Sequence, residues 1–178
     1  MIKSVLSFLL VLVFSGCASS VGRIETHTSE FDGTTETILT PAWVCHEETS
    51  KSCDLQFGLN RRSNMPPEDV ELTVRTPGNY MFVAGESLKF NIDGETVSVA
   101  SISNLTDYNF VDEYHNVWSS QRYLINKTLL SRLLNAKRVA VHVELKDGYR
   151  EGIFSRDARN AARPAFREYY QKVFAAPL

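Results

Sequence analysis

Apolar and polar residues alternate along several short stretches of the chain. The alternation is clearest over residues 70–75, 88–92 and 139–145. Successive side chains of a β-strand point to opposite faces, so each stretch predicts a strand with one buried face. Weaker alternation or β-branched and aromatic composition predicts further strands, over residues 23–29, 35–45, 53–59, 97–99, 118–125 and 149–154.

Turn residues separate these stretches. Pro77-Gly78 has the two residues that a type II turn needs, while Asp93-Gly94 and Asp147-Gly148 are typical of tight hairpins. Pro41 interrupts one predicted strand, which indicates a bulge or an edge strand because proline has no N–H to donate. The polar stretch 60–68 predicts a loop, and residues 104–116 predict a looser polar and aromatic segment.

Two stretches have helical spacing instead. Residues 127–136 carry leucines at positions that share one helix face, and Asn126 is suited to be the N-cap. A second helical region is expected to open at Ser155 and to be broken or restarted by Pro164. Within it, Phe166, Tyr170 and Val173 follow i, i+4, i+7 spacing and should pack on the sheet.

The elements together predict a mainly β (α+β) domain. We expect about eight to ten antiparallel strands in a sandwich-like or curved sheet. One short helix and one C-terminal helix should close one end or face of it. About 160 residues suit a single domain with its own core.

The first 20 residues follow another pattern. Lys3 precedes an apolar run over residues 5–14, which is too short to span a bilayer and has the length of a secretory signal. Two small residues, 15 and 16, then precede Cys17. This arrangement resembles the signal peptide and lipobox of bacterial lipoproteins, although Phe14 stands where lipoboxes usually have leucine. The alternative is an ordinary cleaved signal with a chance cysteine at its end.

The resemblance implies that residues 1–16 are removed and that Cys17 carries a covalent lipid. Residues 17–22 would then be a short tether, and residues 23–178 a single periplasmic domain. Ala18 stands where lipoproteins retained in the inner membrane usually carry Asp. The resemblance therefore implies the periplasmic face of the outer membrane, with the inner membrane or the cell surface as alternatives.

Once Cys17 is assigned to the lipid, Cys45 and Cys53 remain as a pair in an oxidising compartment. They enclose a short polar segment, so we expect a disulfide at the tip between two strands. The alternative is a metal site that includes His46 and Glu47. Adjacent strand residues point apart, and no second histidine-containing cluster is near, so the sequence favours the disulfide and predicts no metal site.

Charge and motifs give little sign of chemistry. Residues 17–178 carry 18 Lys and Arg against 21 Asp and Glu, without the basic excess that nucleic-acid binding needs. Motifs for a nucleophilic serine, a zinc helix or a phosphate-binding loop are missing, and the four histidines are dispersed. The sequence predicts no catalytic residue and no cofactor besides the lipid.

Two groups of residues suggest binding surfaces. Aromatic residues edged by carboxylates suit a sugar ring or a peptide strand; these are Tyr108, Phe110, Tyr114 and Trp118. The alternative is that Tyr108 and Phe110 fill the core from a strand whose acids face water. Arginines spaced 3, 4 and 4 share one helix face, which could meet an anionic partner or merely be solvated; these are Arg156, Arg159, Arg163 and Arg167.

The function expected from the sequence is that of a membrane-anchored envelope lipoprotein. It would be a non-enzymatic binding or accessory module for an envelope protein or glycan. One alternative is a hydrolase or transferase of envelope polymers, with Asp112 and Glu113 as acid and base. Another is a carrier that holds a hydrophobic ligand inside the curved sheet.

Overall fold

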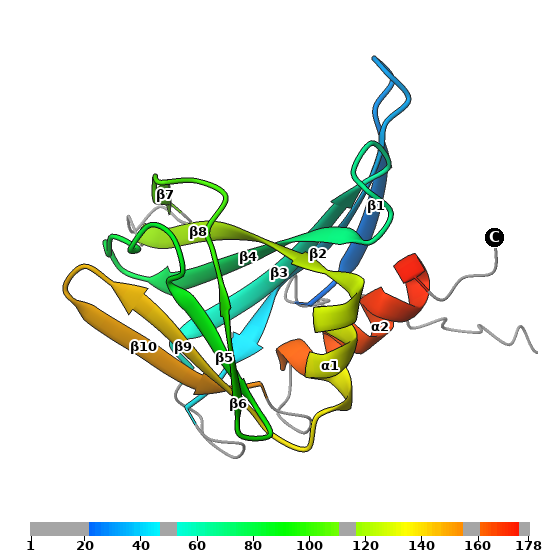
Figure 1. The fold of residues 1–178 in the computed structure, drawn as a ribbon. Helices are drawn as coiled ribbons and strands as arrows, with labels where there is room; N and C mark the ends of the chain where they lie inside the picture. The colour runs from blue at the N-terminus through cyan, green and yellow to red at the C-terminus, as the bar shows by residue number, and fades with distance from the viewer. Residues whose placement is uncertain (1–21, 47–52, 111–116, 155–160, 175–178) are drawn as a thin grey trace, which may run out of the picture.

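Two antiparallel sheets make up most of the computed structural model, which describes residues 22–46, 53–110, 117–154 and 161–174 (Figure 1). The six-stranded sheet contains, in spatial order, β1 (Ile24–Thr28), β2 (Thr35–Val44), β3 (Leu55–Arg62), β4 (Asp69–Pro77), β8 (Val117–Asn126) and β7 (Asp107–Phe110). The four-stranded sheet contains β10 (Gly148–Ile153), β9 (Val139–Leu145), β5 (Leu88–Ile92) and β6 (Glu95–Val99).

The two sheets join at their corners. Isolated bridges link Cys45 to Ile153 at one corner and Ser101 to Tyr123 at another. Phe57 of the larger sheet meets Phe90 of the smaller one edge to face, with ring centroids 6.2 Å apart. The described residues therefore form a curled, sandwich-like β domain with an aromatic core, which confirms the predicted fold class.

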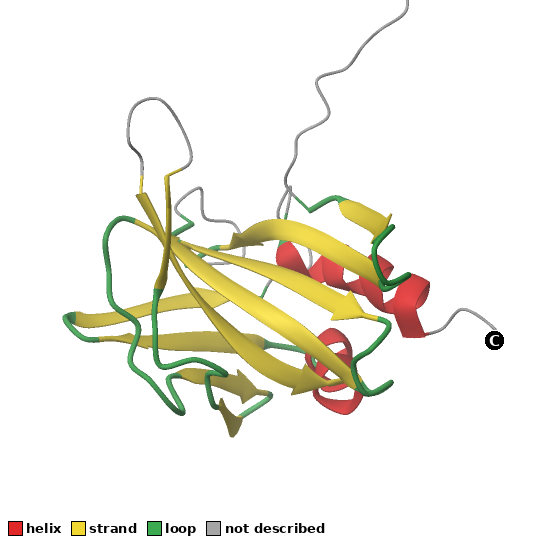
Figure 2. Cartoon of the chain, turned by 90° about the horizontal axis from the view of Figure 1, so that it is seen from above, coloured by secondary structure: helices red, strands yellow, loops and turns green. Residues whose placement is uncertain are grey.

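Two helices lie next to each other at one end of the sheets (Figure 2). They are α1 (Lys127–Asn135) and α2 (Ala162–Phe174). Asn126 caps α1 as predicted, because its side-chain oxygen accepts a hydrogen bond from the Leu129 N–H at 2.8 Å. Pro164 lies in the first turn of α2, where its missing N–H costs no intrahelical hydrogen bond. Residues 155–160, where the second helical region was expected to open, lie outside the described ranges.

Helix α2 packs against β2 and β3 through a face that includes the three predicted residues but is centred on Phe166 and Tyr169. Phe166 is fully buried, whereas Tyr170 and Val173 only flank the core. Tyr169 is the second buried ring, and its hydroxyl donates to the carbonyl oxygen of Thr37 at 2.9 Å. This hydrogen bond satisfies the hydroxyl of a tyrosine that is otherwise buried. The i, i+4 spacing of apolar residues does not show that such a partner is available, so the sequence did not predict burial of Tyr169.

Pro41 forms the predicted bulge. The register of β2 against β3 shifts between Leu39 and Ala42, and β2 has neighbours on both sides, so it is not an edge strand. Gly58 of β3 faces this bulge. A Cβ at Gly58 would lie 2.9 Å from the Leu39 carbonyl oxygen and 3.3 Å from Cγ of Pro41. The bulge therefore requires glycine on the neighbouring strand.

Two predicted loops are partly strand. β3 continues to Arg62 because a partner on β2 accepts its polar side chains: Glu36 Oε1 lies 2.7 Å from Asn60 Nδ2 and 2.9 Å from Arg62 Nε. The segment expected to be irregular contains β7, which pairs with β8. Asp93 and Gly94 have φ of 52° and 100° and form the predicted tight hairpin. In the ranges that the structure describes, neither helix has the length and apolarity needed to cross a membrane.

Candidate functional site

Cys45 and Cys53 form the predicted disulfide. Cys45 is buried, and its carbonyl oxygen accepts a hydrogen bond from Ile153 N at 2.7 Å. The bridge therefore lies at a corner where the two sheets meet. It ties the end of β2 to the start of β3 and thereby fixes the position of β10.

The alternative metal site beside this bridge is wrong. Both thiols are consumed by the disulfide, and Nε2 of His46 lies 2.9 Å from Oδ2 of Asp54. Glu47 lies outside the described residues. In the parts of the chain that are described, three His, Cys, Asp or Glu side chains nowhere come together as a metal ion needs.

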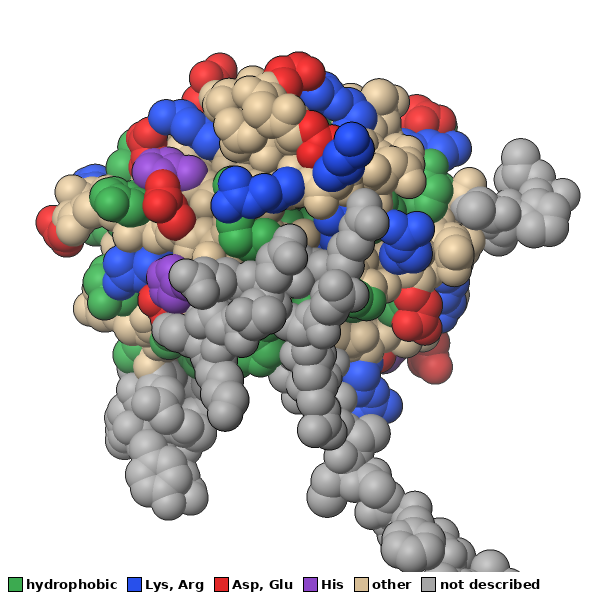
Figure 3. All heavy atoms as spheres, turned by 90° about the horizontal axis from the view of Figure 1, so that it is seen from below, with side chains coloured by type: hydrophobic (Ala, Val, Ile, Leu, Met, Phe, Trp, Pro, Cys, Tyr) green, Lys and Arg blue, Asp and Glu red, His purple; other side chains and the backbone are tan. Residues whose placement is uncertain are grey.

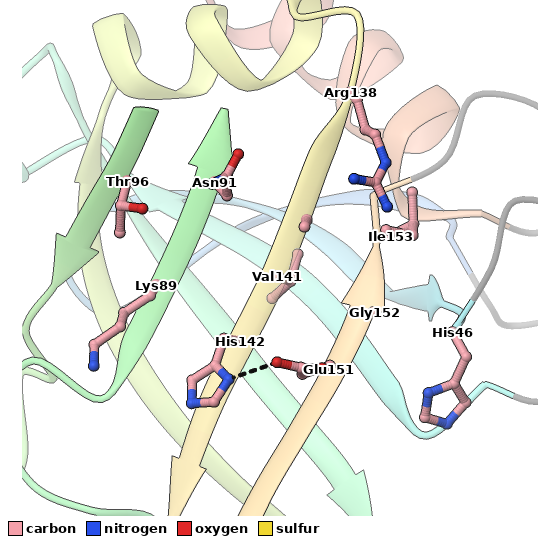
Figure 4. A pocket seen from close by; sticks show the side chains of 11 residues that line it. His46, Lys89, Asn91, Thr96, Arg138, Val141, His142, Glu151, Gly152 and Ile153 are labelled. Atoms are coloured by element: carbon pink, nitrogen blue, oxygen red, sulfur yellow. Dashed lines mark hydrogen bonds and ion pairs between the residues drawn. The ribbon is translucent and has the colours of Figure 1, made fainter. Parts of the chain in front are cut away.

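A pocket of about 420 Å³ lies on the outer face of the four-stranded sheet (Figure 4). Strand register builds its floor, because Lys89 of β5 and Glu151 of β10 both pair directly with His142 of β9. These three face outward while their neighbours Val141 and Val143 face the core. The further polar lining residues are His46, Asn91, Thr96 and Arg138.

The outward row is held by hydrogen bonds across the strands. Nδ1 of His142 lies 3.0 Å from Oε1 of Glu151, and the imidazole stacks on Tyr149 with centroids 5.1 Å apart. Lys89 Nζ donates to Oε1 of Glu144 at 2.5 Å, and this hydrogen bond lowers the pKa of Glu144. These charges therefore pair with one another, and basic and acidic side chains are intermixed on the face seen in Figure 3.

Arg138 differs from the other cations of the pocket. Its backbone N–H donates to Oδ1 of Asp93 at 2.8 Å, but its guanidinium has no ion pair with any carboxylate of the described chain. In Figure 4 the guanidinium extends into the pocket. Asn91 uses its side-chain oxygen to accept from Gly94 N at 2.9 Å, which leaves its amide N–H groups for a ligand. The pocket thus offers donors, from Arg138, Asn91 and Thr96, to a ligand that carries acceptors.

The predicted aromatic surface is split by the strand register. Tyr108 pairs with Ser119, whereas Trp118 pairs with Asn109, so Tyr108 and Trp118 lie on opposite faces of the sheet. The side chain of Phe110, and residues 111–116 with Tyr114, Asp112, Glu113 and His115, lie outside what the structure describes. The described part of the predicted surface is therefore not one surface.

Trp118 instead belongs to a group on the outer face of the six-stranded sheet, which we call the Trp43–Trp118 cluster: Trp43, Gln56, Arg75 and Trp118. The two indole rings lie 5.9 Å apart at 54°, and the guanidinium carbon of Arg75 lies 4.7 Å from the centroid of the Trp118 ring. Arg75 Nε donates to Oε1 of the buried Gln56 at 2.6 Å. Burial lowers the pKa of Arg75.

Sequence reasoning missed three members of this cluster because they come from separate strands. Trp43 pairs with Gln56, and Gln56 pairs with Arg75, only in the register of the folded sheet. One available signal was that Trp43 and Arg75 occupy outward positions of strands whose neighbours are apolar. An outward tryptophan together with an outward arginine is a reason to look for a shared surface.

The structure describes two of the four arginines of the predicted face, and one of them, Arg163, is buried. Arg163 is only 2% exposed, and its Nη2 donates to the carbonyl oxygens of Leu134, at 3.0 Å, and Ala136. Arg167 Nη2 donates to the same Leu134 oxygen at 2.9 Å. Both arginines therefore bind the C-terminal end of α1, whose unpaired carbonyls attract cations. Arg156 and Arg159 lie outside the described residues.

In comparisons with known proteins, no protein-family model, no curated protein and no solved structure matches this chain.

Proposed function

We propose that this chain is a lipid-anchored protein of the bacterial envelope whose β domain binds another envelope component. The lipid is carried by Cys17, and the domain is held at the periplasmic face of the outer membrane. No cofactor besides the lipid is part of this role. The partner is an envelope protein or glycan.

The observation that carries the proposal is the Cys45–Cys53 disulfide. Structural disulfides form in oxidising compartments such as the periplasm, and they are rare in the cytosol. The chain has three cysteines, and the third, Cys17, stands directly after the short apolar run and the two small residues. Export and acylation of Cys17 account for all three cysteines together.

The tether supports a role close to the membrane. Residues 18–22 can extend over only about 17 Å, at 3.3–3.6 Å per residue. A domain on such a tether reaches components at or near the bilayer surface. This favours a partner that is itself in or against the membrane.

The pocket of the four-stranded sheet supports binding. Its unused donors on Arg138, Asn91 and Thr96 suit a polar partner with carbonyl, hydroxyl or carboxylate oxygens. Ala140, which is partly exposed, provides an apolar contact among the polar lining residues. A partner segment that enters the pocket can therefore bury apolar atoms and satisfy its acceptors at the same time.

Site-specific photocrosslinking in cells tests this role. A photoreactive residue at Thr96, inside the pocket, should give one dominant crosslinked envelope product, and the same residue at Leu105, which is 74% exposed outside the pocket, should not. The product at Thr96 should weaken in an Arg138→Gln background and persist with Lys137→Gln, an exposed neighbour outside the pocket. Equal crosslinking at both positions, or none at Thr96, would contradict the proposal.

A further inference from the structure

We propose that the Trp43–Trp118 cluster binds an acidic sugar, whose carboxylate is taken by Arg75 and whose ring lies against an indole. The inference rests on the binding role proposed above. It depends neither on the lipid anchor nor on the pocket of the other sheet.

Among the residues that the structure describes, Arg75 is a half-buried cation without a counter-ion. Its polar contact there is with Gln56, a neutral amide that is only 2% exposed. Burial lowers the pKa of Arg75, and no carboxylate of the described ranges opposes the effect. Taking a guanidinium out of water costs free energy that a neutral amide offsets only in part. An anionic ligand would supply the missing partner.

Several acids on this face of the sheet pair with other arginines. Arg122 forms ion pairs with Glu71 at 3.6 Å and with Asp107 at 3.5 Å. Arg62 pairs with Glu36 at 2.9 Å. Arg75 lies on β4 between the two strands that carry Gln56 and Ser120, and it has none of these acids.

Two contacts restrict the guanidinium of Arg75. Its carbon lies 4.7 Å from the centroid of the Trp118 ring, and its Nε donates to Gln56. Neither Nη group has a hydrogen bond to a described residue. A guanidinium held in this way presents parallel N–H groups that match the two oxygens of a carboxylate.

The two indoles favour a ring-shaped ligand over a bare anion. Trp43 and Trp118 are partly exposed, and their rings meet at 54°, so they form two sides of a shallow angle beside Arg75. The C–H face of a pyranose packs well on an indole. A phosphate ion or a lipid headgroup would use the charge and leave the rings without a role.

The tryptophans make the test direct. The chain contains two tryptophans, and both belong to the cluster, so the intrinsic tryptophan fluorescence of the full chain reports on this site alone. The full-length chain in neutral detergent micelles is titrated with methyl glucuronide. Methyl glucoside is the matched neutral sugar, because it differs only in the carboxylate. Sodium acetate and sodium phosphate test an anion without a sugar ring.

We expect a saturable fluorescence change with methyl glucuronide. The other three compounds should bind at least about tenfold more weakly, since a charged hydrogen bond contributes about 1.5–3 kcal/mol. Arg75→Gln should weaken glucuronide binding by about tenfold or more, while Arg122→Gln should leave it within about twofold. An equal response to glucoside, an equal response to acetate or phosphate, or no saturable change with glucuronide would each overturn the proposal.

The comparison of ligands on the unmodified chain decides the question even if Arg75→Gln fails to fold. Failure of this proposal is also distinguishable from failure of the proposed function. The crosslink at Thr96 reports on the opposite sheet, so a negative titration with a positive crosslink would remove the sugar site and leave the envelope-binding role in place.

Discussion

Arg163 of α2 donates a hydrogen bond to the carbonyl oxygen of Leu134, in the last turn of α1, at 3.0 Å. The same guanidinium reaches Ala136, the C-cap residue of α1. The C-terminal end of one helix is thus capped by a buried side chain of the next. This contact fixes the two helices relative to each other at the end of the sheets.

Replacement of this arginine should destabilise the fold strongly. Arg163→Gln removes charge-assisted hydrogen bonds from a buried side chain to the end of α1, so we expect a loss of about 2–4 kcal/mol in the free energy of unfolding. Urea denaturation measures this loss. Arg132→Gln is the matched control, because Arg132 pairs with Glu95 at the surface and should cost less than about 1 kcal/mol. Equal losses for the two variants would show that Arg163 does not cap α1.

The Pro41 bulge makes a prediction about the opposite strand. Gly58→Ala places a Cβ 2.9 Å from the Leu39 carbonyl oxygen, which is backbone and cannot move aside easily. We expect a loss of about 1–3 kcal/mol in unfolding free energy, from strain rather than from a lost contact. Ser98→Ala, at an exposed strand position, should change the stability by less than about 0.5 kcal/mol. If Gly58→Ala is as stable as the parent chain, the bulge does not need glycine.

The disulfide should contribute to the stability of the fold. Reduction, or the double change Cys45→Ser with Cys53→Ser, should lower the free energy of unfolding by about 2–3 kcal/mol, because the open loop gains entropy in the unfolded chain. Denaturation with and without a reductant measures the difference. The double variant should show no response to reductant. A chain that is equally stable in both conditions would mean that the corner between β2 and β10 is held by backbone pairing alone.

Glu36 should make the stability depend on pH in the acid range. Hydrogen bonds from Arg62 and Asn60 lower the pKa of Glu36 below its ordinary value of 4.5. The folded state therefore binds this proton less readily than the unfolded state. The resulting stability is present above about pH 4.5 and is lost as the pH falls through the lowered pKa.

Unfolding free energies at several pH values test this linkage. From about pH 6 down to pH 3, the parent chain should lose more stability than Glu36→Gln, whose side chain does not titrate. Glu30→Gln is a suitable control, since Glu30 lies in the exposed turn between β1 and β2. Parallel curves for the parent and Glu36→Gln would mean that the contacts of Glu36 with β3 do not form in solution.

Local patterns predicted most of the strands, both helices and the disulfide, because alternation, capping and cysteine spacing act over a few residues. Asn126 and the Asp93-Gly94 hairpin are examples in which one or two residues decide the local geometry. The extension of β3 to Arg62 was not predictable in this way. It depends on Glu36, which is 26 positions away and becomes a neighbour only through sheet register.

The binding surfaces depend on register even more. Tyr108 and Trp118 look like one aromatic group in the sequence, yet the β7–β8 pairing puts them on opposite faces. Trp43 and Arg75 are separated along the chain by two turns of the sheet and become neighbours of Trp118 only after folding. For Arg163, helical spacing predicts the face of α2 on which it lies, but it does not predict the contact with the C-terminal end of α1. Such contacts require tertiary structure.

Intact mass spectrometry of the full-length chain, purified from the membrane fraction of its native host, tests the central claim most directly. The account predicts a polypeptide that begins at Cys17 and carries the added mass of a diacylglycerol and an amide-linked acyl chain. Cys17→Ser should abolish that mass. A membrane-derived chain with an unmodified Cys17, or with a different first residue and no lipid, would contradict the proposal that this β domain is anchored in the envelope by its own N-terminus.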